Sequence, residues 1–271
     1  MGRYWRQLSV SPAIMLKRFT KRTGPRPFVI LFVPRTGSNL LAGMLDTHPD
    51  VLCHHELFLP GSPPHRSLSV REGAIDLDLG GAEERDRDPV AFLSRVFGLD
   101  MGRSAVGFKL ALSDPNVGVL LGLILNRSVR KIVVRRDNWL HVYTSALIAE
   151  QTHSLIRFSR ESPGAPDPGP VRVNVDVARF RAYARKRRLA YGALRWIARL
   201  TGQRFHELEY EEIKDPVRLN GLLAYLGVSQ NAELRERTVK QNPSRLEDRI
   251  DNFAEVRRQL RGTRYEAYLA G

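Results

Sequence analysis

The chain has 271 residues, of which 42% are hydrophobic and 27% charged, as in an ordinary folded protein. This length suits one α/β domain. The formal net charge of +14, mostly from Arg, indicates anionic partners such as a nucleotide, a nucleic acid or an acidic lipid. The single cysteine, Cys53, excludes an intramolecular disulfide, and no apolar run reaches the roughly 18 residues of a membrane span. We therefore expect a cytoplasmic protein.

Residues 1–26 form a basic segment that lacks the apolar core and small-residue cleavage site of a secretory signal. We expect a basic N-terminal arm, either frayed or packed as a helix on the body, followed by a single domain over residues 27–271. Alternatively, the arm could lie on an anionic membrane, which would make the protein peripheral to the inner face of that membrane.

From residue 28 onwards the sequence alternates strands and helices. Continuous β-branched apolar runs predict buried strands, and apolar residues at helical spacing predict helices. The expected strands are 28–33, 51–53, 104–112, 130–136 and 205–210. The expected helices are one that follows residue 37 and those over 89–98, 117–125, 138–152 and 176–200. Pro and Gly predict loops, with at most short helices, over 60–90 and a loop or lid over 160–171. This order predicts an α/β fold with a P-loop-like central parallel sheet and helices on both faces.

The turn PRTGSN (34–39) joins the first strand to the first helix. A tight Gly turn between a strand and a helix directs backbone N–H groups and the positive helix end towards a phosphate. Arg35 adds a charge, and Ser38 and Asn39 add side-chain donors. The turn lacks the second Gly and the Lys–Ser/Thr pair of a GxxxxGK[ST] motif, which disfavours a nucleoside-triphosphate kinase. The alternative is an ordinary strand–turn–helix unit.

This turn resembles the 5′-phosphosulfate loop of the sulfotransferases that use 3′-phosphoadenosine 5′-phosphosulfate (PAPS), particularly the bacterial nodulation-factor type. RKIVVRRDNWLHVYTSALIAEQT (130–152) resembles the 3′-phosphate segment of that family, and LEYEEI (208–213) and NPSRLEDRIDNF (242–253) are weaker matches. The resemblance covers most of residues 28–266. It implies PAPS as donor, 3′-phosphoadenosine 5′-phosphate (PAP) as product, no metal, and a carbohydrate or glycolipid acceptor.

The resemblance also implies which residues contact the nucleotide. In the family, an Arg at the strand end and a Ser one helical step later hold the 3′-phosphate, and Arg136 and Ser145 match these positions. Arg135 is the alternative to Arg136, and only one of the two can face the nucleotide because neighbouring strand residues face opposite ways. Thr144 is the alternative to Ser145. Lys240 would either close the 3′-phosphate pocket or remain a solvated charge. The nucleotide-contacting residues are then Arg35, Thr36, Gly37, Ser38, Asn39, Leu40, Arg136, Ser145, Thr144 and Lys240.

Sulfuryl transfer needs a base for the acceptor hydroxyl and positive charge at the leaving phosphate. Glu56, in VLCHHELF (51–58), is the base candidate, and it matches the Glu thought to act as base in bacterial carbohydrate sulfotransferases. His55 is a rival base, whereas His54 is expected to be a hydrogen-bonding core residue. Arg35 would supply a fixed positive charge. Lys109 would either contact a sulfuryl oxygen or extend to solvent.

A nucleic-acid-binding protein without catalysis is the main alternative from another class. The charge and the Arg-rich stretch 179–199 would suit it, yet no helix-turn-helix, zinc spacing or aromatic RNA motif is visible. We therefore expect no nucleic-acid partner. A nucleotide-dependent P-loop kinase and a catalytically inactive PAPS-binding relative are the remaining alternatives.

Overall fold

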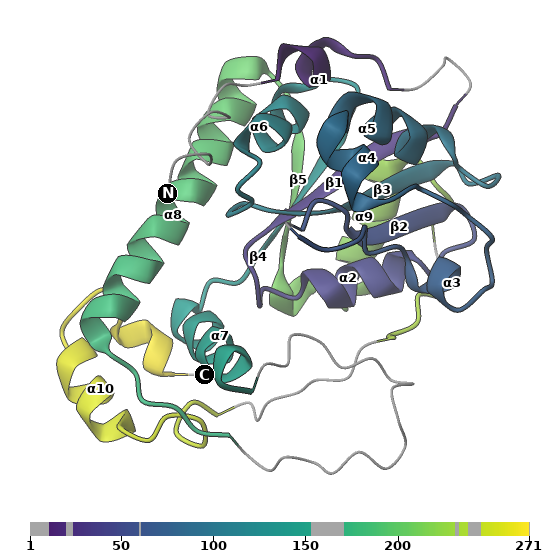
Figure 1. Ribbon diagram of the computed structural model, residues 1–271. Helices are drawn as coiled ribbons and strands as arrows, with labels where there is room; N and C mark the ends of the chain where they lie inside the picture. Colours follow the sequence, from purple (N-terminus) through teal and green to yellow (C-terminus); the bar gives the residue numbers. More distant parts are fainter. Residues whose placement is uncertain are drawn as a thin grey trace.

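A parallel sheet lies at the centre of the computed structural model (Figure 1). The structure describes residues 11–19, 24–59, 61–152, 171–230, 233–237 and 245–270. Within these residues the sheet has five strands in the order β2-β3-β1-β4-β5, and each neighbouring pair is parallel. The strands are β1 (Arg26–Phe32), β2 (Val51–Glu56), β3 (Ala105–Ala111), β4 (Arg130–Arg135) and β5 (Phe205–Glu209). The predicted α/β class with a parallel sheet is therefore confirmed.

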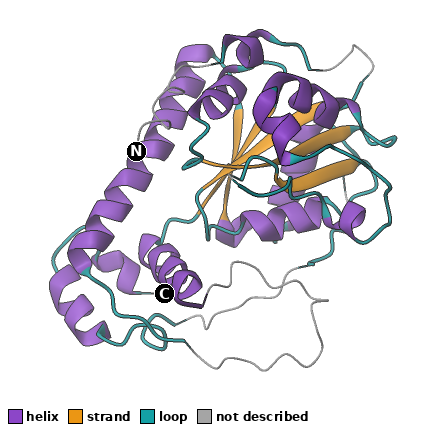
Figure 2. Cartoon of the chain, in the orientation of Figure 1, coloured by secondary structure: helices purple, strands orange, loops and turns teal. Residues whose placement is uncertain are grey.

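Helices cover both faces of the sheet, as the purple and orange elements of Figure 2 show. The α-helices are α1 (Pro12–Leu16), α2 (Ser38–Leu45), α3 (Leu68–Arg71), α4 (Ala82–Arg87), α5 (Pro89–Gly98), α6 (Val117–Leu125), α7 (Trp139–Thr152), α8 (Val177–Thr201), α9 (Pro216–Leu226) and α10 (Phe253–Leu260). Two short 3₁₀ helices are η2 (Tyr210–Glu212) and η3 (Glu266–Leu269). In the part of the chain that is described, no helix is both long enough and apolar enough to cross a membrane.

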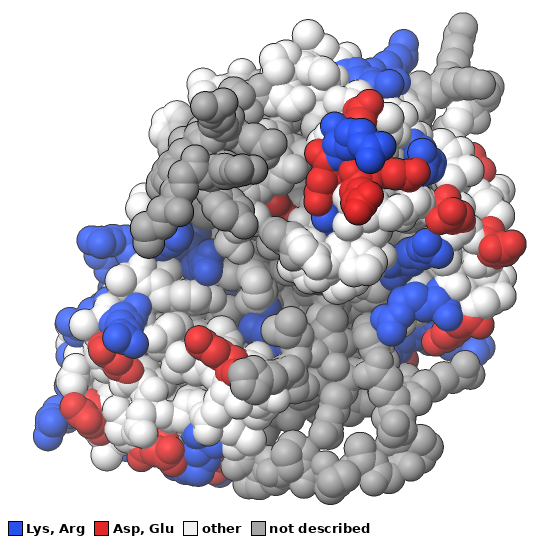
Figure 3. All heavy atoms as spheres, viewed as in Figure 1, with Lys and Arg blue, Asp and Glu red and all other residues white. Residues whose placement is uncertain are grey.

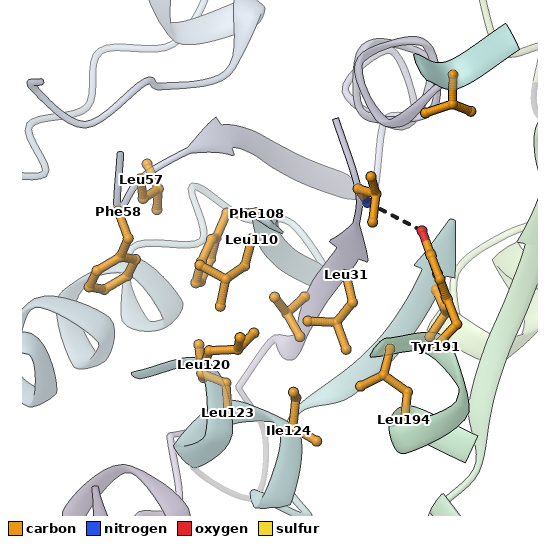
Figure 4. Packing of buried hydrophobic residues seen from close by; sticks show 14 of the residues in the cluster. Leu31, Leu57, Phe58, Phe108, Leu110, Leu120, Leu123, Ile124, Tyr191 and Leu194 are labelled. Atoms are coloured by element: carbon orange, nitrogen blue, oxygen red, sulfur yellow. Dashed lines mark hydrogen bonds between the residues drawn. The ribbon is translucent and has the colours of Figure 1, made fainter. Parts of the chain in front are cut away.

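The central strand β1 contributes to two separate cores because successive strand residues point to opposite faces. Phe28, Ile30 and Phe32 pack with apolar residues of α2 and α9. Val29 and Leu31 belong to the other core, which α5, α6 and α8 cover. Figure 4 shows this second core, where Leu31 lies among side chains of β3, α6 and α8. Burial on both faces explains why the strand is a continuous apolar run.

The observed elements match most of the predicted ones to within one or two residues. The main difference is β2, which was expected to end at Cys53 and continues to Glu56. The short helix α1 packs on α6, where Asn126 Nδ2 donates to the Ile14 carbonyl at 2.6 Å. The division into an arm (1–26) and a domain (27–271) stays a prediction, since 1–10 and 20–23 lie outside the described residues. Most of the expected loop 160–171 lies outside them as well.

Candidate active site

The turn after β1 has the backbone of an anion-binding loop. Arg35 and Gly37 both have positive φ, 74° and 91°. A Cβ on Gly37 would lie 2.4 Å from Cδ2 of Tyr210, so only glycine fits without a shift of that ring. Leu41 donates the first helical hydrogen bond of α2, to the Gly37 carbonyl at 3.1 Å. The N–H groups that precede it belong to the helix N-terminus, where an anion is favoured.

The side chains of this turn divide between structural and binding roles. Thr36 is fully buried, and its backbone N–H and its hydroxyl both donate to the Val33 carbonyl, with Oγ1 at 2.7 Å. Thr36 therefore closes the turn rather than facing a ligand. Ser38 is buried at the first position of α2. Asn39 accepts a hydrogen bond from Lys109 through Oδ1. The Leu40 side chain packs against the core that α2 and α9 form on one face of the sheet, which leaves only its backbone N–H for a ligand.

The two predicted phosphate segments meet through a direct contact. Arg35 Nε donates to Ser145 Oγ at 2.9 Å, which joins the turn after β1 to helix α7. Burial lowers the pKa of Arg35 from its ordinary value. Thr144, the alternative to Ser145, is fully buried and its hydroxyl has no hydrogen-bond partner. Ser145 is therefore the residue of the two that contacts the phosphate loop.

The two arginines at the end of β4 have different surroundings. The Arg136 guanidinium lies 4.4 Å from the ring centroid of Tyr210, the same ring that limits Gly37, and its Nε is 3.5 Å from Glu211. Arg136 thus shares a neighbour with the phosphate loop, which favours it over Arg135. Arg135 is instead engaged by three carboxylates at 2.9–3.8 Å, those of Asp137, Glu207 and Glu209.

Arg249, which the sequence did not single out, adds a third cation to this region. It is 3% exposed, and its Nη1 donates to His141 Nδ1 at 3.3 Å, while Nε and Nη2 have no hydrogen-bond partner. Burial, and then the charges of Arg136 and Arg35, lower the pKa of Arg249 to about 10. A buried guanidinium with two unused donors beside two like charges is the environment that an anionic ligand would complete.

Arg249 is held in place by a short parallel bridge between Val173 and Ile250, in which Val173 N donates to the Arg249 carbonyl at 3.0 Å. One signal in the sequence could have found it. Leu246, Arg249 and Ile250 follow a helical spacing that places the arginine on an apolar side. Lys240, the residue predicted to close this pocket, lies outside the described residues.

A β-bulge at the end of β2 brings Glu56 beside Lys109. His54 pairs with Phe108, and the next register pair is Glu56 with Lys109, so His55 is the extra residue. Without the bulge, strand alternation would place His55 opposite Lys109 and direct Glu56 to the other face. Glu56 Oε1 lies 4.0 Å from Lys109 Nζ, and its side chain is 23% exposed. The carboxylate can therefore be reached from solvent at the carboxyl edge of the sheet.

Lys109 is buried in this cluster and does not extend to solvent. Its side chain is 1% exposed, its Nζ donates to Asn39, and the ammonium lies 4.9 Å from the ring centroid of Phe32. Burial lowers the pKa of Lys109, and the nearby Glu56 carboxylate partly opposes that shift. Lys109 thus links the phosphate loop, through Asn39, to the candidate base.

The two histidines of β2 differ from Glu56 in their access to solvent. His54 is fully buried and accepts a hydrogen bond from Ser67 N at 3.1 Å, which is the core role expected for it. Burial lowers the pKa of His54 to about 3. His55 is also buried, and burial followed by the charge of Lys109 lowers its pKa well below the usual value. Its burial makes His55 a poorer match than Glu56 for a base that must reach an acceptor hydroxyl.

Two residues that the sequence did not identify hold the strand ends in place. Arg85 is 1% exposed and its Nη1 donates to the carbonyls of Leu57, Leu59 and Ser62, which fixes the loop after Glu56. Tyr191 of α8 accepts a hydrogen bond from Val33 N at 3.2 Å, the dashed line in Figure 4, and donates to the Val134 carbonyl at 2.7 Å. Tyr191 therefore ties the ends of β1 and β4 together beneath the phosphate loop.

The arrangement combines a helix N-terminus, three neighbouring arginines and a Glu–Lys pair at one edge of the sheet. It can bind a ligand with two anionic groups and accept a proton from a hydroxyl group. Among the described residues, no group of three or more His, Cys, Asp or Glu side chains could hold a metal ion.

Two nodulation proteins are similar to this chain over most of its length. The chain is 25% identical over 250 residues to nodulation protein H of Rhizobium tropici. The matched region covers 90% of this chain and 93% of that protein. It is 27% identical over 241 residues to nodulation protein H of Rhizobium meliloti (strain 1021), covering 86% and 90% of the two chains. These similarities over most of the chain support a bacterial sulfotransferase. The predicted resemblance to the nodulation type is thereby confirmed, along with the prediction of a sulfotransferase enzyme.

Other comparisons add little to this assignment. No family model matches the chain. A solved sulfotransferase from Alicyclobacillus acidocaldarius is similar at 18% identity and a TM-score of 0.44, over 90% of this chain and 96% of that one. A TM-score this low supports no argument about fold or function. The support for a sulfotransferase therefore comes from the two nodulation proteins.

Proposed function

We propose that this sulfotransferase moves a sulfuryl group from PAPS to a hydroxyl of a carbohydrate or glycolipid by in-line displacement. The observation that supports the donor is the 2.9 Å hydrogen bond between Arg35 and Ser145. It joins the two predicted phosphate segments, which are 110 residues apart in sequence at this contact. PAPS carries anionic groups at both its 5′ and 3′ ends, which fits a site of this kind.

The proposed donor fits the residues that the structure places around the site. The 5′-phosphosulfate would lie at the N-terminus of α2, where the turn through Gly37 presents backbone N–H groups and Arg35 supplies charge. The 3′-phosphate would be held by Ser145, Arg136 and Arg249, whose Nε and Nη2 lack partners. Thr144 and Leu40 are then neighbours rather than side-chain ligands, and Thr36 keeps the turn closed.

Glu56 is the proposed general base. It would take the proton of the acceptor hydroxyl as that oxygen attacks sulfur and the bond from sulfur to the 5′-phosphate oxygen breaks. Lys109 and Arg35 would stabilise the negative charge that develops on the bridging oxygen. His55 is the alternative base. The proposed acceptor class follows the resemblance to the nodulation type, since the described residues contain no feature that selects one hydroxyl.

Calorimetric binding of PAP, compared with AMP and with ATP–Mg²⁺, tests the proposed donor. We expect PAP to bind at least tenfold more tightly than AMP, because AMP cannot use the 3′-phosphate residues. Arg136→Gln should remove most of that preference, whereas Arg218→Gln, on exposed α9, serves as the matched control. Equal affinity for PAP and AMP would contradict the PAPS assignment. Preferential binding of ATP–Mg²⁺ would favour a kinase, and binding only to nucleic acid would favour the non-catalytic alternative.

A further inference from the structure

The long helix α8 has an outer face that the proposed chemistry does not use. It runs along one side of the molecule from α10 to α1 (Figure 1). Its 25 residues include no Asp or Glu. Its inner face, with Phe180, Ala184, Tyr191 and Leu194, packs on the body, and this packing accounts for the fold. The composition of the outer face therefore needs a separate explanation.

Three large apolar side chains project from that outer face into solvent. Leu189, Trp196 and Leu200 are 66%, 64% and 80% exposed. Trp196 and Leu200 follow Leu189 by seven and eleven residues, close to two and three helical turns, so the three form one stripe. Leu16 of α1 is 77% exposed, and α1 lies near the C-terminal end of α8 (Figure 1). Arg127 donates to the Thr201 carbonyl, and its neighbour Asn126 donates to the carbonyls of Ile14 and Lys17.

Cations surround this apolar stripe. Arg185, Lys186, Arg188 and Arg199 are exposed on α8. Within the described residues, ion pairs occupy Arg179 and Arg195 of this helix but none of these four. Figure 3 shows Lys and Arg side chains gathered over the middle of α8. An exposed Trp–Leu stripe flanked by unneutralised cations is the pattern of a helix that lies in the headgroup region of an anionic bilayer.

The same face continues into a groove beside the N-terminal half of α8. The groove has a volume of about 520 Å³, and its lining includes Ala182, Tyr265, Arg181, Arg185 and Arg264. Because Ala182 and Arg185 precede Leu189 by seven and four residues, the groove and the stripe lie on one side of the helix. A lining that combines guanidinium groups with apolar side chains suits a lipid phosphate and the start of its acyl chains.

We propose that the outer face of α8, defined by Leu189, Trp196, Leu200 and their flanking cations, docks on an anionic phospholipid membrane. Charge complementarity selects this occupant. A second copy of the chain, or the basic residues 1–10, would bring further positive charge to a positive face. Nucleic acid would pair with the cations but would leave the Leu residues in water. The inference does not depend on the reaction at the candidate active site.

Vesicle flotation of the full chain tests this proposal. Phosphatidylcholine vesicles are compared with vesicles that also contain phosphatidylglycerol. We expect binding to the anionic vesicles only, weakened by salt. The combined substitution Arg185→Gln, Lys186→Gln and Arg188→Gln should weaken binding about 100-fold, at roughly fivefold per cation. Leu189→Ser, Trp196→Ser and Leu200→Ser combined should also release the protein. The matched control is Val217→Ser, which removes a side chain that is 78% exposed on α9.

A second measurement keeps the test independent of any loss of folding. With Trp5→Phe introduced, Trp196 is the exposed tryptophan, since Trp139 is buried. Its emission should shift to the blue on anionic vesicles and be quenched by brominated lipid. Failure to bind anionic vesicles, or binding that both combined variants retain, would overturn the proposal. So would a self-association or a duplex-DNA affinity that the α8 variants abolish while vesicle binding persists.

Discussion

At the scale of single residues, the chemistry proposed here depends on which side chain faces Lys109. The bulge at His55 decides this, because it brings Glu56 into the register position opposite Lys109. A carboxylate 4.0 Å from a buried ammonium and partly open to solvent can take a proton from an incoming hydroxyl. The buried His54 and His55 imidazoles have no comparable access.

Glu56→Gln tests this assignment because the amide keeps the shape of the side chain and loses the basic oxygen. We expect turnover to fall by a factor of about 10² to 10⁴, the usual contribution of a general base, while PAP affinity changes little. The measurement is transfer of labelled sulfate from PAPS to a panel of sugars, oligosaccharides and glycolipids.

Two further variants make this result specific. Glu83→Gln, at an exposed position on α4, should behave as the wild type. His55→Gln should retain activity if Glu56 is the base. Full activity in Glu56→Gln together with inactivity in His55→Gln would transfer the role to His55.

At the scale of elements, the phosphate loop depends on packing between the turn after β1 and the 3₁₀ helix η2. The Tyr210 ring occupies the space that a side chain at position 37 would need, and it also supports the Arg136 guanidinium. The two phosphate segments are therefore coupled through one aromatic ring as well as through the Arg35–Ser145 hydrogen bond.

Gly37→Ala should damage binding through this coupling. The new Cβ meets Tyr210 Cδ2 at 2.4 Å, and an L-residue is strained at a φ of 91°. We expect PAP affinity to fall at least tenfold, together with a loss of about 1–2 kcal/mol in the free energy of unfolding. Calorimetry and urea unfolding measure the two effects.

Gly73→Ala is the matched control for this prediction. Gly73 has a φ of 75° but open space around it, so the variant has similar backbone strain without a clash. Its stability should fall while PAP affinity stays unchanged. If Gly37→Ala bound PAP as well as Gly73→Ala does, the packing of the loop against Tyr210 would not matter for the nucleotide.

Most elements could be predicted because their strands are buried on both faces and read as continuous apolar runs. β2 was predicted too short since His54, His55 and Glu56 interrupt such a run, although a core role was expected for His54. The bulge was equally hidden, because register depends on the neighbouring strand. Strand alternation correctly indicated that Arg135 and Arg136 diverge.

The residues missed in the site share one property: tertiary contacts define their roles. Arg249 is one of 43 basic residues, and the spacing of Leu246 and Ile250 around it indicates an apolar side but not the neighbouring Arg35 and Arg136. Arg85 lies in the stretch 60–90 that was predicted as loop with at most short helices, and it binds the loop after Glu56. Such roles arise from long-range packing, which residue type and spacing do not encode.

At the scale of the whole molecule, the positive charge of the site favours the binding of an anionic ligand and lowers the stability of the ligand-free protein. Arg35, Arg136 and Arg249 lie close enough to lower the pKa of Arg249, so they repel one another in the ligand-free protein. A dianionic ligand would relieve that repulsion and stabilise the fold by linkage. At 100 times its Kd, PAP should add about 2.7 kcal/mol, which raises the Tm of a chain of this size by about 5–10 °C.

Arg249→Gln separates these two effects within one protein. Without ligand, its Tm should equal or exceed that of the wild type, because one of three repelling charges is removed and the amide can still donate to His141. At the same PAP concentration, a tenfold loss of affinity would reduce the stabilisation to about half.

Arg258→Gln, at an exposed position on α10, should change neither quantity. Thermal unfolding with and without PAP measures both. A lower Tm without ligand, with an unchanged shift on adding PAP, would make Arg249 a structural residue and leave the 3′-phosphate to Arg136 and Ser145.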